Sequence, residues 1–149
     1  GNSGPSVVVG GKGVAAEQVG PGDHGSTYGG NPLCCAAAQA VLTALAEDDA
    51  MQQATLIREA LVSALRDDLR DTNLISEVRG KGLMIGIQPN TATGEIVKRG
   101  LDHGLLLNIA GGDTIRVLPP LVMTLEQAGE LGAGIARILN DVAEQEDKT

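Results

Sequence analysis

The sequence LISEVRGKGLMIGI, residues 74–87, carries the clearest β-pattern in this chain. Two short apolar runs, residues 74–78 and 83–87, flank the tripeptide Gly80-Lys81-Gly82. Short runs rich in Ile, Leu and Val that end at glycines are typical of strands, and glycine permits the backbone angles that a tight turn requires. These residues therefore predict a β-hairpin.

A second pair of short strands is expected downstream, at residues 105–109 and 114–118, with a glycine-containing turn between them. A short helix over residues 93–103 precedes this pair and ends before Gly104, which suits the position that follows a helix. After two prolines, the sequence Thr124-Leu125-Glu126-Gln127 has the pattern of a capping box, which predicts the start of a final helix.

Two helices are expected before the first hairpin. Asn31 and Pro32 suit the N-cap and the first position of a helix over residues 33–46, and residues 51–70 repeat apolar side chains at helical spacing. Residues 1–30 are rich in Gly, Pro and Ser, which predicts loop or linker. The order of elements indicates an α+β fold, with helices packed on a small, mostly antiparallel sheet, in a domain over residues 31–149.

Composition limits the classes of partner. The 149 residues carry a formal net charge of −8 at pH 7, and Tyr28 stands alone among Phe, Trp and Tyr. An acidic chain without a basic stripe repels nucleic acid and anionic membranes. No apolar run reaches the roughly 20 residues of a membrane span, and the adjacent Cys34 and Cys35 resemble neither a disulfide framework nor a zinc site. We therefore expect a cytoplasmic protein that binds neither nucleic acid nor membranes and holds no metal.

One segment has the composition of an anion site. The run Gly25-Ser26-Thr27-Tyr28-Gly29-Gly30 precedes the helix expected at Asn31. Glycines and hydroxyls before a helix N-terminus can hold a phosphate, because backbone and side-chain donors converge there. The same residues are also ordinary turn formers, and taken alone a local turn is the favoured interpretation. His24, next to Asp23, is interpreted as a solvated loop histidine rather than a tuned base.

Three cationic side chains accompany the expected strands. Arg116 lies in the middle of an otherwise apolar strand, where its guanidinium must find a carboxylate from either the protein or a substrate. The sequence leaves both sources open. Arg79 and Lys81 flank Gly80 in the first hairpin, and surface charge is the favoured explanation for both.

Four segments, in order, resemble the class III aminotransferases of the acetylornithine type. They are GDHGSTYGGNPL at residues 22–33, VRGKGLMIGI at residues 78–87, GLLLN at residues 104–108 and IRVLPPL at residues 115–121. The chain departs from the family pattern at Gln88, where the family often has Glu. The resemblance implies the C-terminal part of a fold-type I transferase that depends on pyridoxal phosphate, with residues 31–149 as its small domain.

The resemblance also implies an activity and site residues. Such an enzyme is a homodimer that moves an amino group from N2-acetylornithine to 2-oxoglutarate in arginine biosynthesis, with active sites between the subunits. By the same resemblance, Thr27 binds the cofactor phosphate of the neighbouring subunit, Ser26 lies near both cofactor and substrate, and Arg116 lies near the substrate carboxylate. Residues 1–30 would be a linker and the cofactor-phosphate loop, a remnant of the end of the large domain.

The resemblance fails at one essential residue. A transaminase needs a lysine whose amine bonds to the cofactor and carries the proton during the reaction. The family places this lysine in a T-x-A-K-G-x-G-G-G segment upstream of the loop that resembles residues 22–33. The only upstream lysine here is Lys12, which lies too close to Gly22 for that spacing and is interpreted as a linker residue. No catalytic residue is therefore assigned, and the chain alone is expected to be inactive.

Two functional hypotheses follow. In the first, the chain is a piece of an aminotransferase and shares the function of that enzyme. In the second, it is a free-standing, non-catalytic α+β module that kept the fold and acts through binding or assembly. The two hypotheses differ in whether the coding sequence continues upstream in the source DNA.

Overall fold

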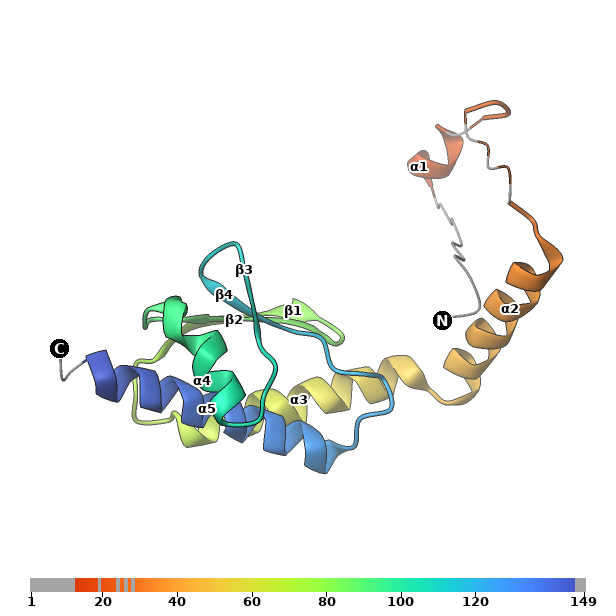
Figure 1. Cartoon of the computed structure of the whole chain (residues 1–149). Coiled ribbons are helices and arrows are strands. Elements are labelled where there is room, and N and C mark those ends of the chain that lie inside the picture. The colour runs from red at the N-terminus through yellow and green to blue at the C-terminus, as the bar shows by residue number, and fades with distance from the viewer. Residues whose placement is uncertain (1–12, 19, 24, 26, 28, 147–149) are drawn as a thin grey trace. The chain divides into compact units, whose positions relative to one another are not determined.

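The computed structural model describes residues 13–18, 20–23, 25, 27 and 29–146. The chain divides into two compact units, residues 1–49 and residues 50–149, and each is described separately (Figure 1). The first unit contains α1 (Val14–Glu17) and α2 (Pro32–Glu47), and the second begins with α3 (Ala50–Asp68). The boundary expected at residue 30 concerns the domains of the family, and it stays a prediction.

The first unit is mainly the helix α2. The carbonyl oxygen of the Asn31 side chain accepts hydrogen bonds from the backbone N–H groups of Leu33, over 2.9 Å, and Cys34, over 3.3 Å, which confirms the predicted N-cap. Residues 1–30 were expected to be loop or linker, and α1 corrects this at four of them. Lys12, His24, Ser26 and Tyr28 lie outside the described residues.

The second unit is built on a four-stranded antiparallel sheet with the order β1-β2-β4-β3. The strands are β1 (Ile75–Lys81), β2 (Met84–Pro89), β3 (Asn108–Ala110) and β4 (Thr114–Val117). Both predicted hairpins are confirmed, but the turn of the first lies at Gly82 and Leu83, since Gly80 and Lys81 belong to β1. Gly80 has a φ of +135°, and a Cβ there would lie 2.0 Å from the Met84 carbonyl oxygen, so the first hairpin requires glycine at this position.

The third strand is shorter than the predicted range of residues 105–109. Strand β3 begins only at Asn108. The backbone N–H of Leu105 donates instead to the carbonyl oxygen of Gly100 over 2.7 Å, and the Leu105 side chain lies against Gly134 in the last helix. Tertiary packing of Leu105 therefore overrides its local preference for a strand.

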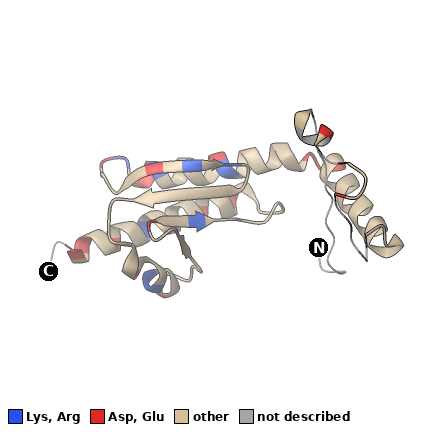
Figure 2. Ribbon diagram, turned by 90° about the horizontal axis from the view of Figure 1, so that it is seen from above, with Lys and Arg blue, Asp and Glu red and all other residues tan. Residues whose placement is uncertain are grey.

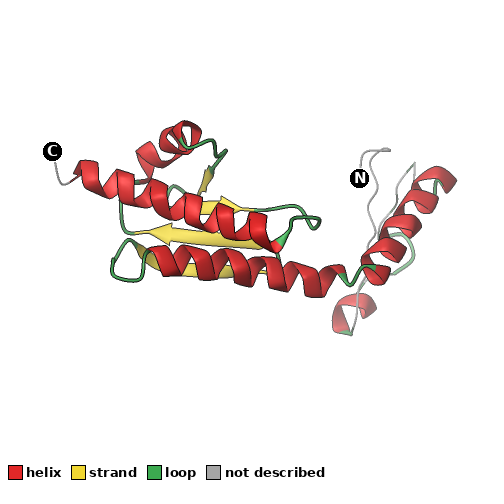
Figure 3. Ribbon diagram, turned by 90° about the horizontal axis from the view of Figure 1, so that it is seen from below, coloured by secondary structure: helices red, strands yellow, loops and turns green. Residues whose placement is uncertain are grey.

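Helices α3 and α5 (Leu125–Glu146) cover one face of the sheet, as Figure 3 shows. The side chains between them and the strands are aliphatic, as the composition predicted. The largest fully buried ones are Ile57, Leu61, Leu65, Ile85, Ile87, Ile96, Ile115, Ile135, Ile138 and Leu139. Full burial of one such side chain contributes about 1.5–3 kcal/mol, so this cluster is the core of the second unit.

The remaining predicted helix signals are also confirmed. A short 3-10 turn, η1 (Thr93–Glu95), leads into α4 (Ile96–Asp102), and Gly104 after it has a φ of +73°. At the start of α5, the backbone N–H of Gln127 donates to the Thr124 hydroxyl over 3.1 Å, and the backbone N–H of Thr124 donates to the Gln127 side chain over 3.0 Å. These reciprocal bonds form the capping box.

Candidate functional site

Thr27 lies in the glycine-rich segment that leads into α2, and it is exposed. Gly30, just before the helix, has a φ of +76°. Because Asn31 already accepts hydrogen bonds from the amides of Leu33 and Cys34, these two donors are engaged in capping the helix. An anion at this loop would therefore depend on the Thr27 hydroxyl and on other backbone groups rather than on those amides.

Arg116 lies on the face of the sheet opposite to α3 and α5. Its neighbours in β4, Ile115 and Val117, are buried, and Arg116 is exposed, because successive side chains of a strand point to opposite faces. In the sheet register, Arg116 is flanked by Gly86 of β2 and Asn108 of β3. The structure shows no hydrogen bond or ion pair of the Arg116 side chain with any described residue, which leaves its guanidinium available for a ligand carboxylate.

Arg79 lies in the same row of the sheet, on the other side of Gly86. Sequence reasoning favoured surface charge for Arg79, and its side chain is 46% exposed, but the structure adds specific partners for it. Its guanidinium donates to Glu77 over 2.6 Å, to Gln88 over 3.0 Å and to Thr114 over 2.9 Å. Figure 2 looks onto this face of the sheet and shows charged residues on β1 and β4 but none on β2.

Two lysines lie in the described part of the chain, and neither sits in an enclosed site. Lys81 is exposed at the end of β1, in the first hairpin. Lys98 of α4 is 73% exposed and lies 3.6 Å from the Glu95 carboxylate. Neither position resembles that of a lysine held against a cofactor, which must be shielded from water to keep its amine reactive. Among the described residues, no lysine is therefore placed for covalent attachment of a cofactor.

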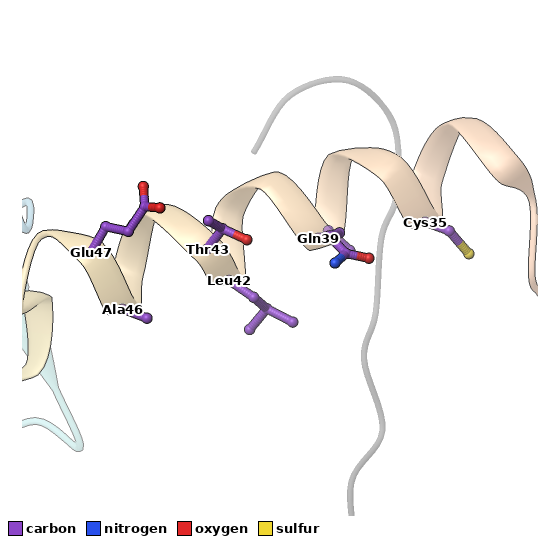
Figure 4. A pocket seen from close by; sticks show the side chains of 7 residues that line it. Cys35, Gln39, Leu42, Thr43, Ala46 and Glu47 are labelled. Carbon is purple, nitrogen blue, oxygen red and sulfur yellow. The ribbon is translucent and has the colours of Figure 1, made fainter.

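A shallow hollow runs along α2, lined by Cys35, Ala38, Gln39, Leu42, Thr43, Ala46 and Glu47 (Figure 4). All of these residues come from the one helix, so the hollow is an exposed helix side rather than a closed ligand site. In the part of the chain that the structure describes, no three His, Cys, Asp or Glu side chains are grouped as metal ligands. Among the same residues, no helix is both long and apolar enough to cross a membrane.

The model of the family described as "Aminotransferase class-III" matches residues 5–139. The chain belongs to this family. Class-III aminotransferases depend on pyridoxal phosphate, which confirms the expected cofactor class and the family inferred from the four sequence segments. The α+β fold of a small aminotransferase domain is confirmed as well.

Individual class-III relatives cover most of this chain. Acetylornithine aminotransferase 1 of Bordetella bronchiseptica is 38% identical over 133 residues, which are 89% of this chain and 33% of that protein. Acetylornithine aminotransferase of Streptococcus mutans is 43% identical over 130 residues, which are 85% of this chain and 32% of that protein. The crystal structure of ornithine aminotransferase from Toxoplasma gondii matches with a TM-score of 0.75 and 30% identity, over 87% of this chain and 32% of the other. The chain therefore spans about a third of the length of the relatives that it matches.

Proposed function

We propose that this chain is the C-terminal part of an aminotransferase that moves an amino group from N2-acetylornithine to 2-oxoglutarate in arginine biosynthesis. The observation that carries the proposal is the 43% identity to a relative named acetylornithine aminotransferase. A homodimer in the cytoplasm, with active sites between its subunits, belongs to the same proposal. Ornithine aminotransferases are also among the similar proteins, so the experiment must test whether the substrate is N-acetylornithine or ornithine.

The proposal gives roles to three side chains. Thr27 donates its hydroxyl hydrogen to the cofactor phosphate of the neighbouring subunit, and Ser26 beside it contacts cofactor and substrate. Arg116 binds a substrate carboxylate, because a planar guanidinium can donate two parallel hydrogen bonds to the two carboxylate oxygens. Bound pyridoxal phosphate would supply the ring that accepts electrons from the substrate carbon.

The 149-residue chain is proposed to be inactive by itself. The exposure of Lys81 and the Glu95 contact of Lys98 support this, because neither amine is shielded as a reactive amine must be. The lysine that attaches the cofactor would come from the two thirds of the enzyme that the relatives have and this chain does not span.

A chimaeric enzyme tests the proposal. Residues 22–141 of this chain replace the corresponding segment of Streptococcus mutans acetylornithine aminotransferase. We expect the chimaera to transaminate N-acetylornithine in preference to ornithine, with 2-oxoglutarate as acceptor. Arg116→Gln should raise the KM of a carboxylate substrate by about ten-fold or more, because a charge-assisted pair contributes about 1.5–3 kcal/mol.

Lys81→Gln is the matched control, since it removes one positive charge from the same sheet face without touching Arg116. It should change KM little. A folded chimaera that binds the cofactor but prefers ornithine would reject the proposed substrate. Equal effects of the two substitutions would reject the role of Arg116.

The second proposal is a non-catalytic binding or assembly module derived from an aminotransferase. It is supported by helix α2, in which no residue is buried and which exposes Leu33, Val41 and Leu42. A partner that covers this apolar helix would be expected to bind the 149-residue chain tightly. An inactive chimaera that still folds, together with a stable complex of the 149-residue chain, would favour this second function.

A further inference from the structure

A closed ring of hydrogen bonds lies on the helix-free face of the sheet. Arg79 donates to Oε1 of Gln88 over 3.0 Å and to Oγ1 of Thr114 over 2.9 Å. Gln88 in turn donates through Nε2 to one oxygen of Asp113 over 3.0 Å. Thr114 donates its hydroxyl hydrogen to the other oxygen of Asp113 over 2.8 Å. In these four bonds, each donor meets an acceptor and both Asp113 oxygens are used.

The ring ties β1 to β4, two strands that are not paired with each other. Arg79 reaches β4 by passing over β2 at Gly86, its register partner. A Cβ at residue 86 would lie 3.6 Å from Cγ of Arg79 and 3.1 Å from Cγ2 of Thr114. Because Gly86 has no side chain, Arg79 can cross β2 at this point. Through Arg79, the edge strand β1 is thus hydrogen-bonded to the start of β4.

Arg79 and Arg116 differ in whether a carboxylate of the protein balances their positive charge. Arg79 faces the Glu77 carboxylate at 2.6 Å and belongs to a ring that contains the Asp113 carboxylate. Its positive charge is therefore already balanced within the protein. Arg116 follows Thr114 by two residues on the same face of β4, and its side chain forms no hydrogen bond or ion pair with a described residue. Of these two arginines, Arg116 is thus the one able to attract another carboxylate.

Gln88 is the member of the ring with the strictest requirement. It must accept from Arg79 and donate to Asp113 at the same time. A side-chain amide does both, whereas an ionised carboxylate only accepts. A glutamate at residue 88 would place two carboxylates side by side with no hydrogen between them, and the ring would open at Asp113.

We propose that Arg79, Gln88, Asp113 and Thr114 are positioning residues for Arg116. The ring fixes the start of β4 and so holds the Arg116 guanidinium in place for a substrate carboxylate, and it keeps Arg79 from competing for that carboxylate. This inference rests on the proposed function, in which Arg116 binds substrate.

The first test measures the ring itself in the 149-residue chain. Gln88→Glu should lower the hydrogen-exchange protection of the amides in β3 and β4 by about ten-fold, because a hydrogen bond to a charged group is lost and each factor of ten corresponds to about 1.4 kcal/mol. Amides in α3 and α5 should change little. The double variant Gln88→Glu/Asp113→Asn should regain most of the protection, since the new amide can donate to the new carboxylate.

The second test measures Arg116 with glutarate as the probe. Glutarate is added to the 149-residue chain at low ionic strength, and the NMR signal of the Arg116 Nε–H is followed. Gln88→Glu should weaken glutarate binding by about ten-fold, and the double variant should restore it. Lys81→Gln changes the net charge by the same amount on the same face but lies outside the ring, so it should weaken binding less.

The outcomes separate the ring from the function. Unchanged protection in Gln88→Glu, or no recovery in the double variant, would overturn the ring as a positioning device. Equal losses of glutarate affinity in Gln88→Glu and Lys81→Gln would mean that charge repulsion alone explains the weaker binding. That result would also overturn the positioning role of the ring. A third outcome is that glutarate does not shift the Arg116 signal of the wild-type chain, while hydrogen-exchange protection falls in Gln88→Glu and recovers in the double variant. In that case Arg116 does not bind carboxylates, and the ring only links β1 to β4.

Discussion

Gly132 of α5 lies directly against the backbone of α3, so that a Cβ at residue 132 would be 2.3 Å from the carbonyl oxygen of Leu61. Leu61 and Gly132 are both buried on the facing sides of the two helices. The lack of a side chain allows the helices to approach closely at this point, because ridges and grooves at a helix contact set the distance between the axes. The packing of the aliphatic core above them depends on this approach.

We predict that Gly132→Ala destabilises the second unit by at least about 1–3 kcal/mol, the usual cost of overpacking a core. The added methyl group would overlap with backbone, which cannot rotate away. Chemical denaturation followed by circular dichroism measures the change. Gly129→Ala is the control on the same helix, since nothing lies within 4 Å of its Cβ position. It should stabilise the helix by roughly 0.5–1 kcal/mol, and a loss of stability in both variants would contradict the prediction.

Local signals in the sequence were sufficient for most of the fold. Asn31 with Pro32 and Thr124 with Gln127 act through hydrogen bonds that span two or three residues, and both were predicted and confirmed. The first hairpin is local in the same way, because Gly80 and the turn at Gly82 and Leu83 lie within four residues of one another. The contact of Gly132 with Leu61 was not predictable, because it joins residues far apart in the chain whose approach depends on the packed helices.

The candidate site was predictable to a smaller extent. Thr27 and Arg116 were identified through resemblance to a family, and their roles stay predictions. Arg79 was set aside as surface charge, because its partners Gln88 and Thr114 lie 9 and 35 residues away in the chain. Side-chain alternation in the first hairpin places residues 79 and 88 on one face, and that signal could have suggested the pair. The order β1-β2-β4-β3, which brings Thr114 within reach, was not available from the sequence.

A second prediction concerns the start of α5. Thr124→Ala should lower the stability of the second unit by about 1 kcal/mol, because it removes the hydroxyl that accepts from the Gln127 amide. Thr55→Ala is the control, since Thr55 bonds only to the Met51 carbonyl one turn back in the exposed side of α3. Alanine should be neutral or stabilising there. Thermal denaturation of both variants distinguishes a cap from a general effect of threonine loss.

A third prediction concerns covalent binding of the cofactor. Pyridoxal phosphate added to the 149-residue chain and treated with borohydride should give no stoichiometric adduct at a single lysine. Lys81 and Lys98 are solvent-exposed amines, and neither lies in an enclosed site that would select it for reaction with the cofactor. Mass spectrometry of the digested chain maps any label. Stoichiometric labelling of Lys12 would contradict the interpretation of that residue as part of a linker.

A fourth prediction concerns the apolar helix α2, where Leu42 is 56% exposed (Figure 4). The 149-residue chain should bind a hydrophobic dye and self-associate at high concentration, because water disfavours a contiguous apolar surface. Leu42→Gln should reduce both effects. Leu106→Gln is the control, since Leu106 is 91% exposed but lies in the second unit, away from α2 in the sequence. A monomer that binds no dye in sedimentation experiments would count against this surface.

The last prediction concerns Thr27 in the chimaeric enzyme with the upstream part of an acetylornithine aminotransferase. A hydroxyl that donates to a phosphate dianion forms a charge-assisted bond of roughly 1.5–3 kcal/mol. Thr27→Ala should therefore raise the dissociation constant of pyridoxal phosphate by about ten- to a hundred-fold. Thr27→Ser keeps the donor and should lose much less. A residue that only shapes the turn would give a different result: the thermal stability of the cofactor-free protein would change, whereas the dissociation constant would not. Measuring both quantities for both substitutions decides between the two roles, and an unchanged dissociation constant for Thr27→Ala would exclude the phosphate contact.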